Sequence, residues 1–262
     1  MAARITRGKK KISLARIPFV MPTDNDLQER LDAVLTTLHL FFTAGHTASS
    51  GDDLLDREVT VRALDLGRLL SGLMPGQLEV QGLLALMLLT DARRAARVDD
   101  AGELVLLEDQ DRSRWDADEI AEGRLLAARA LVGPEPHGRF ALQAAIAAVH
   151  ARASTWERTD WPLIVRLYDD LLSVWPSPVV QLNRAAAVAM ADGPQAGLAV
   201  LDRVAGDPAL KGYHYLPAAR ADLLRRLGRD SEAADEYRQA LLVVGNDVER
   251  RYLERRLADV TR

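Results

Sequence analysis

The residues best suited to chemistry in this sequence lie on a charged strip at 106–116, which reads LLEDQDRSRWD and follows closely on several arginines. Guanidinium groups and carboxylates this close in sequence can form charge-assisted hydrogen bonds, so the chemistry to expect is ion pairing. The residues that we single out as a candidate interaction site or polar network are Arg93, Arg94, Glu108, Asp109, Gln110, Asp111, Arg112 and Trp115.

Three interpretations of this strip are considered. It can be a solvated set of salt bridges, in which each exposed pair contributes less than ~1 kcal/mol. It can be a buried or interfacial polar network that locks a hairpin between helices or meets a partner. It can also be a carboxylate active site, but Asp-x-Asp is a common spacing, and no nucleophile or metal partner accompanies it. The first two interpretations remain open.

The sequence has none of the usual signatures of catalysis or cofactor binding. It lacks HExxH, GxxxxGK[ST], GxSxG and GxGxxG, and it contains no cysteine. His39 and His46 could share a helix face, but Gly45 is expected to end that helix, so partly buried or capping histidines are favoured over a metal pair. We therefore expect no catalytic, cofactor or metal site, and a protein that is not an enzyme.

His150 lies in the alanine-rich stretch AAIAAVHARA, where a packed histidine is favoured over a general base. Trp156 and Trp161 bracket a loop, and we expect them to pack at the start of the next helix. At the N-terminus, residues 4–16 carry six basic residues and no acid. The candidate phosphate contacts there are Arg7, Lys9, Lys10 and Lys11, and they predict weak, salt-sensitive and sequence-independent binding at best.

Helical periodicity dominates the elements that must position these residues. One segment departs from it: residues 97–107 hold an Asp-Asp-Ala-Gly turn followed by LVLL, which predicts a small β-hairpin. Pro75-Gly76 is expected to end the second helix. The predicted helices cover about 27–42, 49–73, 77–92, 116–132, 139–154, 160–174 and 246–259.

The C-terminal part is repetitive. Small and bulky residues recur there at the spacing of a tetratricopeptide (TPR) helix pair, and residues 179–204 are a looser copy of the same pattern. The closing helix, 246–259, should turn Leu253 and Leu257 inward and its many Arg and Glu residues outward. The positions that carry the pattern are Ala221, Leu224, Gly228, Ala233, Tyr237 and Ala240.

These patterns predict an all-α fold, a right-handed superhelix of antiparallel helix pairs that is TPR-like at the C-terminus and carries one small β-hairpin near 97–107. We expect a basic helical stub at 1–16, a helical subdomain with the hairpin at 17–155 and a TPR-like subdomain at 156–262. A net charge of −4 argues against general nucleic-acid binding, and the longest apolar run, residues 83–89, is too short to span a membrane. A cytoplasmic protein with no membrane partner is expected.

Three long segments, 15–55, 83–116 and 177–202, closely resemble the C-terminal extension of one group of extracytoplasmic-function (ECF) RNA polymerase sigma factors. This is the group with a TPR-like tail that is associated with YCII-related (DGPF) proteins. The resemblance covers about residues 1–260, and its most specific blocks are ASSGDDLL at 48–55 and LVLLEDQDRS at 104–113. His46 departs from the family pattern, which usually has tyrosine there.

The resemblance implies a regulatory and protein-interaction module of a factor that directs RNA polymerase to promoters. The opening AARITRGKKKI resembles the end of the second DNA-binding domain of such factors, so we expect the promoter-recognition domains to precede it. The implied partners are the RNA polymerase core and the factor's own N-terminal domains, with promoter DNA reached only through those domains. The alternative is a small-molecule-sensing helical domain that controls the factor in cis, with a pocket near Arg93, Arg94, Glu108, Asp111, Arg112 and Trp115.

Overall fold

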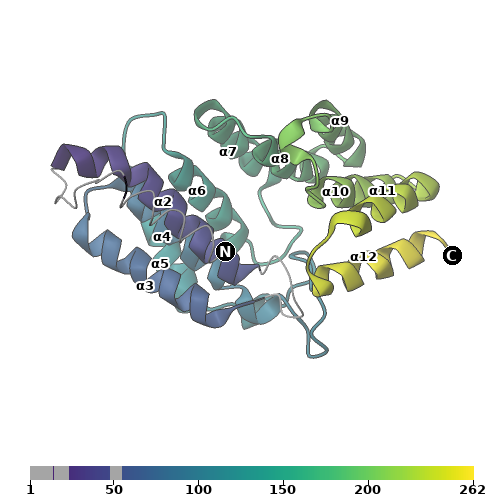
Figure 1. The fold of residues 1–262 in the computed structure, drawn as a ribbon, viewed down its shortest axis with the longest axis horizontal. Coiled ribbons are helices and arrows are strands. Elements are labelled where there is room, and N and C mark those ends of the chain that lie inside the picture. The colour runs from purple at the N-terminus through teal and green to yellow at the C-terminus, as the bar shows by residue number, and fades with distance from the viewer. Residues whose placement is uncertain (1–13, 15–23, 48–54) are drawn as a thin grey trace. The chain divides into compact units, whose positions relative to one another are not determined.

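The computed structural model describes residue 14, residues 24–47 and residues 55–262, and that part of the chain is all-helical, with eleven α-helices and no β-strand (Figure 1). The chain divides into two compact units, Met1–Thr37 and Leu38–Arg262. Helix α2 (Asp24–His46) runs through the boundary between them, and the first unit is helical from residue 24 onward. All the other helices belong to the second unit.

The helices of the second unit pack mainly on their neighbours in sequence. The first four after α2 are α3 (Arg57–Leu73), α4 (Leu78–Asp91), α5 (Ala117–Ala130) and α6 (Arg139–Arg152). The next six are α7 (Trp161–Val174), α8 (Pro178–Ala191), α9 (Pro194–Val204), α10 (Tyr215–Arg226), α11 (Asp230–Val243) and α12 (Asp247–Val260). Five of the predicted helices, those corresponding to α4, α5, α6, α7 and α12, begin and end within two residues of these bounds.

Helix α4 is the centre of the first group, because it packs against α3, α5 and α6. Its sequence, LEVQGLLALMLLTD, is apolar on every side, and ten of its fourteen residues are buried. Gly82 lets α6 approach closely: a Cβ at this position would lie 2.5 Å from the backbone nitrogen of Ala141. A helix with no polar face and a glycine at its closest contact is suited to the middle of a bundle.

A carboxylate from α4 caps the N-terminus of α6. Gly138 occupies the N-cap position of α6 and offers no side chain, so the first backbone N–H groups need an acceptor from elsewhere. Glu79 accepts hydrogen bonds from the backbone nitrogens of Phe140 at 3.1 Å and Ala141 at 2.9 Å. The glycine also makes room for this carboxylate, because a Cβ on Gly138 would lie 2.1 Å from the Glu79 carboxyl carbon.

We expect Glu79→Ala to lower the free energy of unfolding by about 2 kcal/mol, because two partly buried N–H groups lose a charged acceptor and the start of α6 loses a favourable charge. Chemical denaturation followed by circular dichroism measures this change. The control is Glu58→Ala, which removes a first-turn glutamate of α3 whose ion pair with Arg62 is exposed. The control should change stability by less than about 0.5 kcal/mol, and equal losses in the two variants would contradict the capping role.

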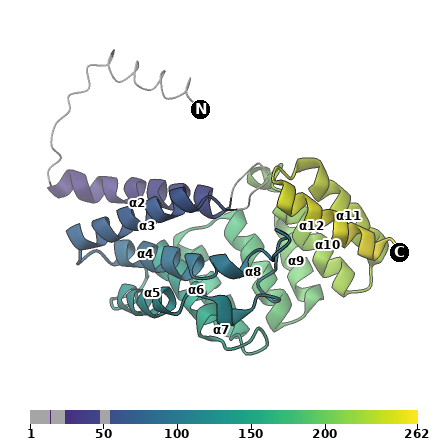
Figure 2. The same cartoon turned by 90° about the horizontal axis from the view of Figure 1, so that it is seen from below.

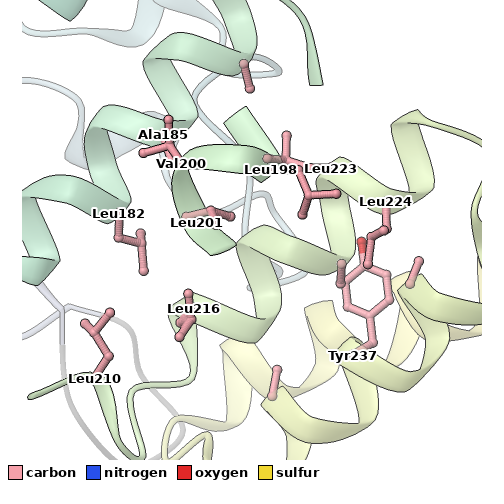
Figure 3. Close-up of a cluster of buried hydrophobic side chains, with 14 of the residues drawn as sticks. Leu182, Ala185, Leu198, Val200, Leu201, Leu210, Leu216, Leu223, Leu224 and Tyr237 are labelled. Carbon is pink, nitrogen blue, oxygen red and sulfur yellow. The ribbon is translucent and has the colours of Figure 1, made fainter. Parts of the chain in front are cut away.

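The C-terminal helices form a second apolar core. Figure 2 shows α10, α11 and α12 side by side, and α8 packs on α9 in the same sequential manner. In Figure 3, Tyr237 of α11 lies beside Leu224 of α10, and the same cluster extends to leucines of α9 and α8. Of the six positions that carry the predicted repeat, all but Gly228 are buried, at 0–3% exposure. Gly228 instead forms the turn between α10 and α11, where its φ of +72° favours glycine.

The segment between α4 and α5 is irregular. Two 3₁₀ helices, η1 (Arg94–Ala96) and η2 (Arg112–Arg114), flank a tight turn in which Val98 and Leu104 form a single isolated antiparallel bridge. Backbone hydrogen bonds join Asp99 to Glu103 and Val105 to Arg97, so the chain reverses here, but the described residues contain no strand. The hairpin predicted for 97–107 is thus not confirmed beyond one bridge.

One predicted boundary differs from that of the structure, and another is not tested by it. The second helix was expected from residue 49, but α3 begins at Arg57, where the Asp56 side chain accepts a hydrogen bond from Val59 N, and residues 48–54 lie outside the described part. The predicted division between residues 155 and 156 falls inside the second unit and stays a prediction. Among the described residues, no helix combines the length and apolar character needed to cross a bilayer.

Candidate functional site

Three arginines meet in the irregular segment after α4. Arg93 and Arg97 flank η1, and the charge of Arg97 acts on Arg93. After the 98–104 turn, η2 brings Arg112 close enough for its charge to lower the pKa of Arg93. We call the grouping of Arg93, Arg97 and Arg112 the arginine cluster.

Two members of the arginine cluster are held by neutral oxygen atoms. Arg97 donates to the backbone carbonyl of His46, at the end of α2, and to the Thr47 hydroxyl at 3.2 Å. Arg112 donates to the carbonyls of His150 at 2.8 Å and Ala153 at 2.7 Å. Both thus bind the unsatisfied carbonyls that a helix exposes at its C-terminus, where positive charge is favourable.

Aromatic rings surround Arg112 and His150. The Arg112 guanidinium carbon lies 4.5 Å from the centre of the buried Trp115 ring. The His150 ring stacks on Trp156 at 6.3 Å and meets the edge of Trp161 at 5.3 Å. This confirms the expected packing of His150 and of the two tryptophans at the start of α7.

We expect Arg112→Met to lower the free energy of unfolding by about 2 kcal/mol, because the end of α6 loses two charge-assisted hydrogen bonds and Trp115 loses its cation. Thermal unfolding measures the loss, with Arg114→Met as the control. Arg114 lies two residues away and is exposed, so its replacement should leave the melting temperature within about 1 °C of the parent's. A similar decrease in both variants would show that the contacts of Arg112 are not what stabilises the fold.

Arg93 differs from the other two, because it has no hydrogen-bond or ion-pair partner among the described residues. It lines a pocket of about 450 Å³ whose other walls come from the C-terminal half of α2 and from α4, α6, α7 and α8. Burial lowers the pKa of Arg93 to about 10, with the charges of Arg97 and Arg112 acting in the same direction. The guanidinium is still protonated at neutral pH, so the pocket contains a full positive charge.

Neighbouring histidines do not add to this charge at neutral pH. Burial lowers the pKa of His150 to about 4, and the positive charges of Arg93 and Arg112 act in the same direction. Burial likewise lowers the pKa of His46 to about 2, again with arginines contributing. His46 stacks on Phe42 at 5.4 Å, and His39 meets the edge of Phe140, so both are packed histidines. In the part of the chain that the structure describes, no three metal-binding side chains gather in one place.

Arg94 belongs to a separate, acidic group. Its guanidinium pairs with Asp91 at 2.9 Å, Glu119 at 3.0 Å and Asp116 at 3.4 Å. One cation thus faces three carboxylates. Burial raises the pKa of Glu119 to about 7, with the negative charges of Asp91 and Asp116 adding to the rise and Arg94 opposing it. Burial also raises the pKa of Asp91.

The remaining candidates shape the loop or face solvent. Asp111 caps η2 by accepting from Ser113 N at 2.9 Å, and Gln110 donates to the Val105 carbonyl at 3.2 Å. Glu108 and Asp109 are exposed. The pocket suggested by the sequence for six of these residues does not form as such, because Arg93 lines a different pocket while Arg94 pairs with acids and Asp111 caps a helix. Arg7, Lys9, Lys10 and Lys11 lie outside the described residues.

Helix α12 contributes polar residues that sequence reasoning placed on its outside. Glu249 is buried at 9% exposure, accepts a hydrogen bond from the Tyr215 hydroxyl, and lies 3.2 Å from His214 Nε2. Arg251 and Arg255 both pair with Glu103, in the turn that follows η1. The expectation of outward-facing Arg and Glu residues is therefore wrong for Glu249, because its carboxylate lies beside the partly buried Tyr215 hydroxyl and His214 imidazole.

Arg97, Glu119, Glu79 and Glu249 are the polar residues that the sequence did not single out as site residues. For Arg97 the usable signal was its place in the basic stretch that begins at Arg93. No comparable signal exists for the other three, since their partners lie 25 to 62 residues away in sequence.

The chain is similar to a family of unknown function and to an uncharacterized bacterial protein. Residues 30–131, which run from α2 to the end of α5 and include all eight candidate residues, match the model of a family described as "Family of unknown function (DUF6596)". The chain is 42% identical over 257 residues, 98% of its length, to an uncharacterized protein of Rhizobium meliloti (strain 1021). The chain spans about 60% of the length of that relative. No solved structure matches.

Proposed function

We propose that the chain is the C-terminal regulatory and protein-interaction module of an ECF RNA polymerase sigma factor, whose full-length form directs the polymerase to promoters in transcription initiation. The resemblance of residues 15–55, 83–116 and 177–202 to that group supplies the sigma-factor identity. The burial of Ala221, Leu224, Ala233, Tyr237 and Ala240 is the observation that carries the scaffold part of the proposal.

The scaffold in this proposal is a TPR-like right-handed superhelix built from α8 to α12. Two features support it. Helices α8 and α9 are joined by two residues and α10 and α11 by three, the lengths typical of antiparallel helix pairs. A Cβ on Gly197 would lie 2.5 Å from the Ala189 side chain, so small residues allow close helix approach, as the repeat requires. Stacked pairs of this kind leave an extended concave surface that suits a polypeptide partner.

The proposed partners are the RNA polymerase core and the promoter-recognition domains of the same factor, in the cytoplasm. The relative from Rhizobium meliloti leaves about 40% of its length outside the match, which is room for further domains. A net charge of −4 and the absence of a nucleic-acid-binding motif support a role in protein contacts, with DNA recognition left to other domains.

The Rhizobium meliloti relative offers a direct test. We expect the intact relative to bind purified RNA polymerase core and to start transcription from a promoter upstream of its own gene. A form that lacks the 257 matched residues should bind the core but change the transcript yield several-fold, because the proposed control acts in cis. The proposal would be overturned if the intact relative did not bind the core, or if both forms gave equal transcript.

A further inference from the structure

The Arg93 pocket has the composition of a ligand site. Among the described residues that line it, Arg93 supplies the one full charge, and none is Asp or Glu. His150, Gln143 and Asn183 add neutral polar groups, while leucine, isoleucine and valine side chains from α4, α6 and α8 cover much of the remaining wall. An apolar cavity of a few hundred Å³ with a few convergent polar groups is the usual form of a small-molecule pocket.

The Arg93 guanidinium has no counter-charge among the described residues. Partial burial of a charge carries a free-energy cost unless a counter-charge or hydrogen bonds compensate it, and the half-buried Arg93 has neither in that part of the chain. Arg97 and Arg112 raise this cost, because their like charges act on Arg93. A bound anion would supply the missing partner, and a carboxylate matches the guanidinium in a two-point hydrogen bond.

The charge balance of the pocket limits the kind of anion. Only Arg93 of the arginine cluster lines the pocket, since Arg97 and Arg112 are held by carbonyl and hydroxyl oxygens. Two histidines line it, His39 and His150; burial lowers the pKa of both, that of His150 to about 4, so neither adds a positive charge at pH 7. One positive charge beside an apolar wall suits a single negative charge on an apolar body, whereas a phosphate dianion would need further cationic donors.

We propose that the Arg93 pocket binds an organic monocarboxylate with an aromatic or branched apolar body, the carboxylate pairing with the Arg93 guanidinium and the body packing between α4, α6 and α8. This inference concerns binding by the chain itself and is independent of the sigma-factor proposal. A carboxylate paired with Arg93 would also offset the like charges of Arg97 and Arg112, which act on Arg93.

The test is calorimetric titration of the 262-residue chain with phenylacetate, indole-3-acetate and 4-methylpentanoate. We expect at least one of these acids to bind with a dissociation constant below about 1 mM. 2-Phenylethanol, which keeps the ring and lacks the charge, should bind at least tenfold more weakly than phenylacetate, and inorganic phosphate should not compete. The proposal is overturned if none of the acids binds at about 10 mM, if the alcohol binds as well as the acid, or if phosphate displaces the acid.

Two variants test whether the acids bind in the Arg93 pocket. Arg93→Met should weaken acid binding at least tenfold and, without ligand, should leave the melting temperature unchanged or raise it by about 2–4 °C, because an uncompensated charge is removed. Ala147→Leu, which narrows the pocket and keeps Arg93, should also weaken binding at least tenfold. The exposed control Arg114→Met should bind like the parent. Undiminished binding by both pocket variants, or marked destabilisation by Arg93→Met, would show that Arg93 serves the fold instead.

Discussion

Gly82→Ala is expected to lower the free energy of unfolding by about 2–3 kcal/mol, although alanine is the better helix former by about 1 kcal/mol. The added Cβ would lie 2.5 Å from the nitrogen and 2.8 Å from the Cα of Ala141. Both are backbone atoms, so no side-chain rotation relieves the clash, and α4 and α6 must move apart. Because α4 is buried on nearly every side, this separation disturbs its packing on the other helices as well.

Urea denaturation measures this effect, and the chain offers a matched control. Gly72 lies near the end of α3, where an added Cβ would have no neighbouring atom within 4 Å, so Gly72→Ala should leave stability unchanged or raise it by up to about 1 kcal/mol. If Gly82→Ala were as stable as Gly72→Ala, the close approach of α4 and α6 would not be a feature of the molecule in solution.

The second large effect concerns pH. Glu119→Gln should be more stable than the parent protein at pH 8 by about 2–3 kcal/mol, and equally stable at pH 4. The pKa of Glu119 is raised from 4.5 to about 7 in the folded protein. Between these two values the folded state holds the proton while the unfolded state releases it, so this group makes stability fall as pH rises. Above pH 7 the decrease in the free energy of unfolding is complete. It amounts to about 1.4 kcal/mol for each unit by which the folded and unfolded pKa values of Glu119 differ.

The quantity to measure is the free energy of unfolding of the variant minus that of the parent, from pH 4 to pH 8. His46 and His150 have lowered pKa values in the folded protein, so they make the parent's stability rise with pH from their folded values toward 6.5, opposite to Glu119. The control is Glu122→Gln, on the same helix, whose carboxylate pairs with Arg68 at the exposed surface. Because this ion pair is exposed, Glu122→Gln should change stability by less than about 1 kcal/mol at pH 8. A difference for Glu119→Gln that did not change between pH 4 and pH 8 would contradict the prediction.

Much of the fold could be predicted from sequence, because helices leave local signals. The apolar run at 83–89, Pro75-Gly76 and the repeat around Tyr237 each depend on residues a few positions apart, and the elements they predicted were found at those places. The start of the second helix was predicted too early, because the acidic 49–53 stretch has a capping composition, while α3 begins after Asp56.

The candidate site was predicted less completely. Composition pointed to the correct segment, but the structure divides its arginines into the arginine cluster, which forms no ion pair with an acid among the described residues, and Arg94, which pairs with three carboxylates. This division depends on where Asp91, Glu119 and the end of α6 lie in space, and adjacent arginines in a sequence carry no information about it. The burial of Glu249 was missed for the same reason, since Tyr215, its partner, is on α10.

The contacts of α12 with the segment after α4 bear on how the chain can be shortened. Glu103 binds two arginines of α12, and Glu249 acts on the charge of Arg97, although about 150 residues separate these groups in sequence. A truncation that removes the last helix would therefore leave Glu103 without its counter-charges and alter the electrostatic balance at Arg97, far upstream. We therefore expect a shortened chain to keep the ion pairs of Glu103 and the charge balance at Arg97 only if it extends through Val260.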